Sequence, residues 1–181
     1  MTGLGLDGPD AQLLAVVIAI RAARTGAGNL SGQDLGSLRL TDPQSAVWAL
    51  EGLGWRPAAD LPGEDPSVPV AVAVPGLGGP ESALPFGKLV RSRVSGWTTR
   101  TVSVKPLKKT GPAVRLAGLF LAAHAPDGNR PAPLPPALPG HCHDALPELL
   151  ARGFLDSLNG DTYRLNPALR HHSGRCADAI T

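Results

Sequence analysis

The feature that most constrains this chain is a helix-forming stretch near its start that leaves almost no polar face. Leu13, Leu14, Val17 and Ile18 follow one another at helical spacing after Asp10, which we expect to cap the helix. A helix that is apolar nearly all round belongs at the centre of a core. The apolar run is far shorter than the ~20 residues that a membrane span requires, so we expect no membrane helix.

Shorter elements follow this helix, which we place over residues 10–24. Ser31 and Asp34 form a capping-box pattern that predicts a short second helix. An Asp-Pro start signal predicts a third helix over residues 43–53, and residues 67–74 have the composition of a β-strand. Three helices followed by a hairpin are the plan of a winged helix, a helix-turn-helix elaborated by a β-wing.

The same order returns in the second half of the chain. Residues 111–124 predict another long apolar helix, and a Pro-rich connector follows it. Asp144 is placed to cap a helix over residues 144–152, and a hairpin is predicted over residues 154–166. The two halves are too different to be a sequence repeat, but their shared order of elements predicts a tandem arrangement.

Residues 148–167, ELLARGFLDSLNGDTYRLNP, carry a more specific pattern. Gly153 suits a left-handed helix end, Phe154 and Leu155 suit the start of a strand, and Asn159-Gly160 suits a hairpin turn. The stretch resembles the end of the recognition helix and the wing in bacterial winged-helix regulators such as the IclR and MarR families. That resemblance implies a winged-helix fold, and it implies DNA contact from wing residues such as Arg164, beside the turn.

Charge is strongly segregated along the chain. Residues 1–81 have a net charge of −5, residues 82–126 have eight positive residues and no acid, and residues 127–181 have a net charge of −1. A cationic block between acidic ends indicates an anionic partner. The alternative interpretation is a solvated surface that balances two acidic lobes.

Within this block, residues 88–104 predict a β-hairpin around a two-residue Ser95-Gly96 turn. That register would gather Arg91, Arg93 and Arg100 on one face and leave Trp97 on the other for packing. The predicted fold is therefore α+β, with two winged-helix units in tandem joined by a basic β-hairpin segment. The predicted parts are a first unit (1–76), a basic linker (77–109), a second unit (110–170) and a mobile tail (171–181).

This organisation predicts a DNA-binding protein, a transcriptional regulator or nucleoid-associated factor that contacts the phosphates of double-stranded DNA in the cytoplasm. The candidate DNA-contacting residues are Arg91, Arg93, Arg100, Lys105, Lys108, Lys109 and Arg164, with Thr41, Gln44 and Ser45 on the third helix of the first unit.

Two other functions stay open. The first unit is acidic, and the candidate recognition helices lack arginine, the residue that most often reads bases. Both features favour a tandem winged-helix protein-interaction module. Such modules occur as partner subunits of SMC–kleisin complexes. A domain that recognises a peptide substrate in a biosynthetic pathway is the other possibility. A protein partner or a homodimer is kept open beside double-stranded DNA.

Chemistry-bearing clusters are few. His141, Cys142 and His143 are weak candidates for zinc ligands, as are His171-His172 with Cys176, but no Cys-x-x-Cys spacing supports them. Two cysteines make no disulfide framework. The chain has no Gly-rich phosphate loop in the right context and no nucleophile elbow, so we expect neither an enzyme nor a cofactor.

Overall fold

The computed structural model describes residues 6–23, 25–61, 63, 65–77, 88–126 and 130–172, so most of the expected mobile tail (residues 173–181) lies outside the described residues. The fold is mixed α+β with two small three-stranded antiparallel sheets. The chain divides into two compact units, residues 3–96 and 97–181, and the boundary falls within helix α4 (Lys88–Val102).

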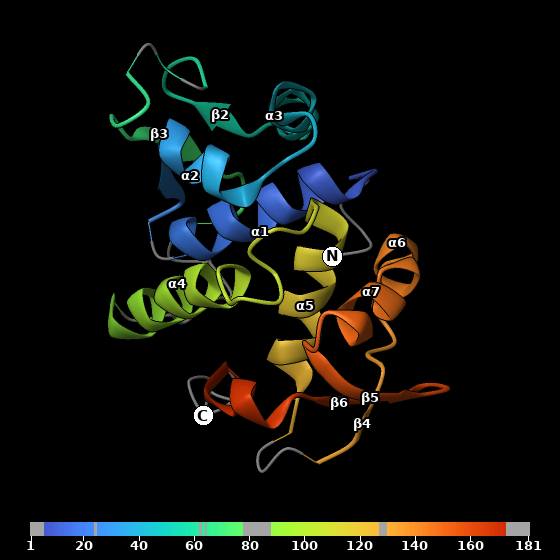
Figure 1. Ribbon diagram of the computed structural model, residues 1–181. Coiled ribbons are helices and arrows are strands. Elements are labelled where there is room, and N and C mark those ends of the chain that lie inside the picture. Colours follow the sequence, from blue (N-terminus) through green and yellow to red (C-terminus); the bar gives the residue numbers. More distant parts are fainter. Residues whose placement is uncertain are drawn as a thin grey trace. The chain divides into compact units, whose positions relative to one another are not determined.

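The first unit begins with a helix and a strand, and two strands precede the N-terminal part of α4 with which it ends (Figure 1). Its elements are α1 (Pro9–Ala22), β1 (Ala27–Leu30), α2 (Gly32–Leu38), α3 (Pro43–Gly52), β2 (Arg56–Pro57) and β3 (Val70–Ala73). In the sheet, β3 lies between β1 and β2 and is antiparallel to both.

Helix α1 is the centre of this unit, which confirms the prediction from its apolar sequence. Leu13 and Leu14 are completely buried, and α1 packs against β1 and α3. The expected cap is wrong, because Gly8 is the N-cap and Asp10 lies in the first turn. The Asp10 carboxylate instead accepts the backbone N–H groups of Thr41 and Asp42, at 2.9 and 3.2 Å. Asp10 thus fastens the start of α3 to α1.

A second polar contact fastens α2. Ser31 and Asp34 form the predicted capping box, and the Asp34 carboxylate also accepts two hydrogen bonds from the Arg21 guanidinium, at 2.7 and 2.8 Å. The Arg21 hydrogen bond is the main reason why the pKa of Asp34 falls from 3.8 to about 2, against the opposing effect of burial. One carboxylate therefore joins α1 and the N-terminus of α2.

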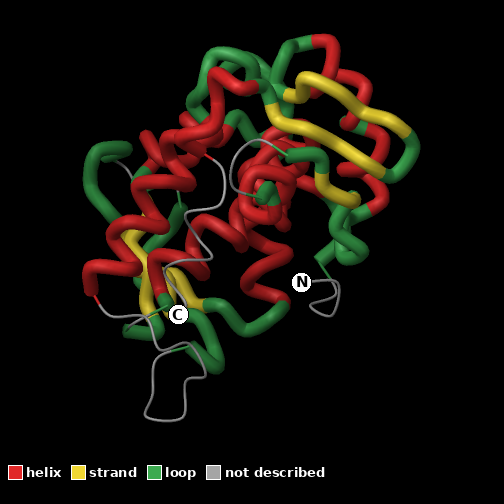
Figure 2. Tube along the Cα trace, turned by 90° about the horizontal axis from the view of Figure 1, so that it is seen from below, coloured by secondary structure: helices red, strands yellow, loops and turns green. Residues whose placement is uncertain are grey.

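The second unit repeats the order of the first (Figure 1). After the C-terminal part of α4 its elements are α5 (Pro112–His124), β4 (Ala132–Pro133), α6 (Gly140–Asp144), α7 (Leu146–Ala151), β5 (Leu155–Asn159), β6 (Thr162–Leu165) and a 3-10 helix (Pro167–His172). Here β6 lies between β4 and β5, just as β3 lies between β1 and β2. The β5–β6 hairpin is the longer pair of yellow strands in Figure 2.

The core of the second unit forms around α5. Phe154 and Tyr163, from the start of the hairpin and from β6, are buried, and the Tyr163 hydroxyl donates a 2.7 Å hydrogen bond to the Leu121 carbonyl. Gly153 has the predicted positive φ, 73°. The hairpin loop is Gly160-Asp161, between the paired residues Asn159 and Thr162, so it lies one residue later than the sequence predicts.

The prediction of a capping Asp144 is also wrong. Asp144 ends the short helix α6, and Ala145 is the N-cap of α7. The helix expected over residues 144–152 is therefore α7, which begins at Leu146, and Asp144 belongs to a separate short helix that precedes it.

The predicted hairpin over residues 88–104 is wrong as well, because residues 88–102 form one helix, α4. The buried residues of α4 are Trp97, Thr98, Thr101 and Val102, which follow the period of a helix. Gly96, expected in a turn, lies inside the helix at a cost of about 1 kcal/mol relative to alanine. Burial of one helical face outweighs that cost.

In the part of the chain that the structure describes, no helix combines the length and the hydropathy needed to cross a bilayer.

Replacement of Asp34 by asparagine should lower the free energy of unfolding by about 1–2 kcal/mol at neutral pH, after allowance for solvent screening of the partly exposed ion pair. The folded-state pKa lies below the unfolded one, so this contribution is complete above about pH 4 and is lost as the pH falls towards 2. The free energy of unfolding of Asp34→Asn should therefore depend less on pH between about 4 and 2 than that of the wild type. Urea unfolding at several pH values measures the effect, with Asp60→Asn, an exposed carboxylate, as control. A wild-type pH profile for Asp34→Asn would contradict the assignment.

Candidate nucleic-acid interface

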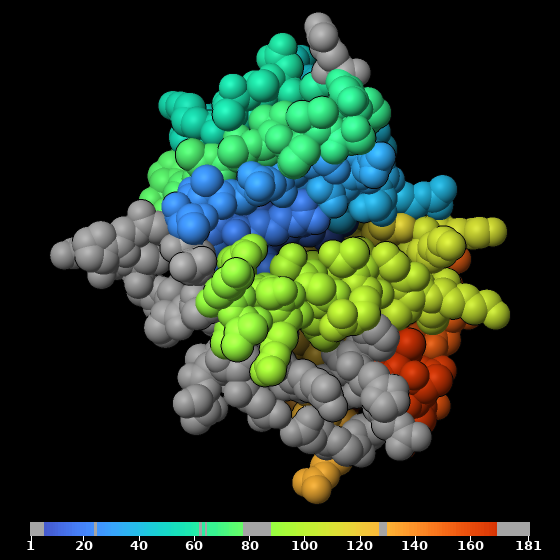
Figure 3. Space-filling model, turned by 90° about the vertical axis from the view of Figure 1, so that its left-hand side faces the viewer, coloured from blue at the N-terminus to red at the C-terminus, as the bar shows by residue number. Residues whose placement is uncertain are grey.

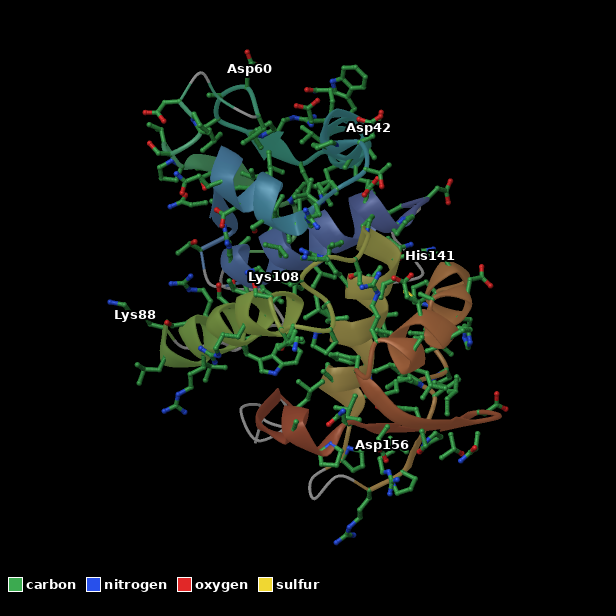
Figure 4. The ribbon with its side chains drawn as sticks, viewed as in Figure 1. Asp42, Asp60, Lys88, Lys108, His141 and Asp156 are labelled. Carbon is green, nitrogen blue, oxygen red and sulfur yellow. The ribbon has the colours of Figure 1, made fainter. Side chains whose placement is uncertain are left out.

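The basic segment, residues 88–109, presents its positive charges without local neutralisation. Its cations are Lys88, Arg91, Arg93, Arg100, Lys105, Lys108 and Lys109, and all except the half-buried Arg91 are exposed. None makes an ion pair with a carboxylate in the described part of the chain, and residues 88–126 contain no acid. Figure 3 shows the yellow-green atoms of α4 at the surface, and in Figure 4 the labelled Lys88 extends away from the start of the helix.

The helical form of α4 changes which arginines lie together. Arg93 and Arg100 are seven residues apart, so they share one side of the helix about 10 Å from each other along its axis. Arg91 points roughly 160° away from Arg93 around the helix. The predicted common face of Arg91, Arg93 and Arg100 is therefore reduced to Arg93 and Arg100.

The lysine loop, residues 103–110, follows α4 and is held in consecutive turns. The backbone N–H groups of Leu107 and Lys108 both donate to the Val104 carbonyl, at 2.9 and 2.8 Å. Leu107 is completely buried and packs on Gly118 of α5, where an added Cβ would lie 2.7 Å from a Leu107 methyl group. A buried leucine thus anchors a loop whose three lysines are exposed.

Arg115 of α5 secures the same loop from inside. Its side chain is buried, its Nε donates to the Thr110 carbonyl at 3.2 Å, and its Nη2 donates to the Lys108 carbonyl at 2.7 Å. One of the eight positive charges in residues 82–126 is therefore internal. The sequence contains a signal for this role, because Arg115 lies within the apolar run of α5. An arginine on a buried helix needs hydrogen-bond acceptors inside the protein.

Carboxylates already accept the backbone N–H groups at the N-terminus of α3. Thr41, Gln44 and Ser45 are exposed, but the Ser45 N–H and hydroxyl already donate to Asp42, at 3.0 and 2.7 Å. These hydrogen bonds lower the pKa of Asp42, which keeps it ionised. Asp10 holds the preceding N–H groups, as described above. A phosphate at this helix end would meet two negative charges, although α3 is the element expected to read DNA.

The corresponding helix of the second unit is no better suited to base reading. The exposed residues of α7 include Pro147, Glu148 and Leu150, and the neighbouring Arg152 pairs with Glu148 at 2.6 Å. Neither α3 (residues 43–52) nor α7 (residues 146–151) contains an arginine or a lysine, the side chains that most often read guanine.

Arg164 on β6, the wing residue singled out in the sequence, forms an ion pair with Asp156 on β5, which Figure 4 labels. Its guanidinium is half-exposed. The positive charge of Arg164 on the β5–β6 hairpin is therefore largely offset by a carboxylate on the neighbouring strand.

Among the candidate metal ligands, His141, Cys142 and His143 do not form a site with a third ligand in the described part of the chain. Cys142 is completely buried, and burial raises the pKa of its thiol to about 12, which disfavours the thiolate that zinc requires. His141 is half-buried, and burial lowers its pKa, whereas His143 is exposed. Among the described residues no group of three potential ligands forms, and the side chains of His171, His172 and Cys176 lie outside that set.

No protein-family model matches the chain, no curated protein matches its sequence, and no solved structure matches its fold.

Replacement of Arg115 by methionine should destabilise the second unit by about 1–3 kcal/mol, because the Lys108 and Thr110 carbonyls lose a charged donor. The lysine loop should also open, so the amide protons of residues 107–110 should exchange faster than those of the β5–β6 hairpin. Thermal melting and hydrogen exchange measure the two effects. Arg130→Met, at an exposed position, is the control. Unchanged exchange in the loop would show that the guanidinium does not hold it.

Proposed function

We propose that this protein consists of two winged-helix units and binds double-stranded DNA through its basic segment. The order helix–strand–helix–helix–strand–strand in each unit, with the last strand in the centre of the sheet, supports the winged-helix assignment. The observation that carries the functional proposal is the display of six exposed cations over residues 88–109 with no carboxylate paired to them in the described chain.

Phosphate is the anion that best suits this surface. Each phosphate that a lysine or arginine neutralises releases a condensed counterion, which drives binding at low salt. The loop that carries Lys105, Lys108 and Lys109 is anchored by Leu107 and Arg115, so only the lysine side chains lose freedom on binding. A pre-formed cationic loop favours contact with a regular phosphate backbone.

The proposed binding is independent of base sequence. Helices α3 and α7, each described in full, lack unpaired arginine or lysine at their exposed positions, and carboxylates close the start of α3. Arg164 contributes little because it is paired with Asp156. These features favour an architectural factor of the nucleoid over a regulator that recognises a specific operator.

Removal of two lysine charges from the loop should weaken binding to all duplexes alike. Lys108→Gln combined with Lys109→Gln should flatten the dependence of log K on log salt by about 0.9 for each phosphate that is no longer neutralised, about 2 for the pair. Fluorescence anisotropy with random-sequence duplexes at several salt concentrations measures this slope.

The matched control removes the same charge elsewhere, with Arg39→Gln and Arg130→Gln at exposed positions outside the basic segment. If the salt dependence of the control variant flattens equally, the effect reflects the net charge of the protein and not contacts made by the lysine loop. A wild-type protein whose affinity does not respond to salt would rule out the proposed mode.

A further inference from the structure

Helix α3 exposes a tryptophan. The indole-bearing residue Trp48 is 61% exposed, whereas Trp55 and Trp97 are 5% and 9% exposed. The buried side of α3 is formed by Ala46, Val47 and Leu50, so Trp48 points away from the core of its unit. A tryptophan placed in this way is typical of an anchor in a protein–protein contact.

The surroundings of Trp48 define the chemistry of what it can contact. Gln44, Ser45 and Gly52 share its exposed side of the helix, and Asp42 and Glu51 flank that side. We call this surface, residues 44, 45, 48 and 52 with the two acids, the Trp48 face. Asp42 is fully exposed and is kept ionised by its bonds to Ser45. The Trp48 face therefore combines an aromatic ring with negative charge.

An indole ring beside carboxylates favours cations as partners. Arginine and lysine bind the face of a tryptophan ring through its quadrupole and pair with acids at the same time. A nucleic acid is disfavoured because its phosphates would meet Asp42 and Glu51. A second Trp48 face is disfavoured because it would oppose like charges.

The chain itself carries a surface of the required chemistry. Arg100 and the three lysines of the loop are exposed, have no carboxylate partner in the described chain, and lie in a segment without acids. We propose that the Trp48 face of one copy of this protein docks on the Arg100 and lysine-loop surface of a second copy. The two surfaces differ, so the contact is head-to-tail.

The inference does not depend on DNA binding, and its test contains no DNA. Sedimentation velocity of the purified full chain over a range of concentrations measures self-association in low and in high salt. We expect the average mass to rise with concentration in low salt and to return to that of the monomer in high salt, because exposed charges are screened. A wild-type protein that stays monomeric in low salt overturns the proposal.

Trp48→Ala should abolish the association while it leaves the melting temperature near that of the wild type, because the side chain is mostly exposed. Val68→Ala, at an apolar residue 54% exposed outside α3, is the matched control and should associate normally. Gln44→Arg, which adds a repelling charge to the same face, is a second variant should Trp48→Ala be unstable. Normal association of both Trp48 face variants, or a failure of Val68→Ala to associate, overturns the proposal.

A mixing experiment tests the head-to-tail geometry. Lys108→Glu combined with Lys109→Glu should remove the other surface, so this variant and Trp48→Ala should each be monomeric alone. Together they retain one intact copy of each surface, and an equal mixture should form 1:1 dimers that do not extend further. Failure of the mixture to associate overturns the head-to-tail contact.

Discussion

Each unit of this protein depends on the burial of a helix that has almost no polar face. Helices α1 and α5 have to be covered on several sides, and a three-stranded sheet with two shorter helices supplies that cover. Polar groups on and near these helices then form hydrogen bonds that join them to other elements. Asp10 binds the start of α3, and the Tyr163 hydroxyl binds the Leu121 carbonyl. Because α5 is buried, the Arg115 guanidinium also needs acceptors inside the protein, and it donates to two loop carbonyls.

Local signals in the sequence predicted much of this fold. The apolar stretch of α1, the Ser31–Asp34 capping box, the Asp42-Pro43 start of α3 and the positive φ of Gly153 are all present as expected. Each depends on residues close together in the chain. The role of Asp10 was not predictable in this way, because its partners lie 31 and 32 residues later and only the folded unit brings them together.

Helix α4 shows how two periods can compete in a short segment. Residues 88–104 alternate well enough for a strand, and Ser95-Gly96 suits a turn, yet Val90, Val94, Trp97 and Thr101 also recur at helical spacing. Burial of Trp97 and Thr101 in the folded chain decides between the two, and sequence alone does not contain that information. The candidate site changed accordingly, since Arg91 no longer shares a face with Arg93 and Arg100.

The unequal exposure of the three tryptophans gives the protein a built-in optical probe. Trp55 and Trp97 are shielded from solvent, so collisional quenchers such as acrylamide or iodide should reach mainly Trp48. The accessible fraction of the emission then reports on one helix of the first unit, and the shielded fraction reports on both cores. Because iodide is an anion and Asp42 and Glu51 flank Trp48, it should quench the exposed indole less efficiently than neutral acrylamide does. The electrostatic surroundings of α3 can thus be measured with the natural chain and no attached label.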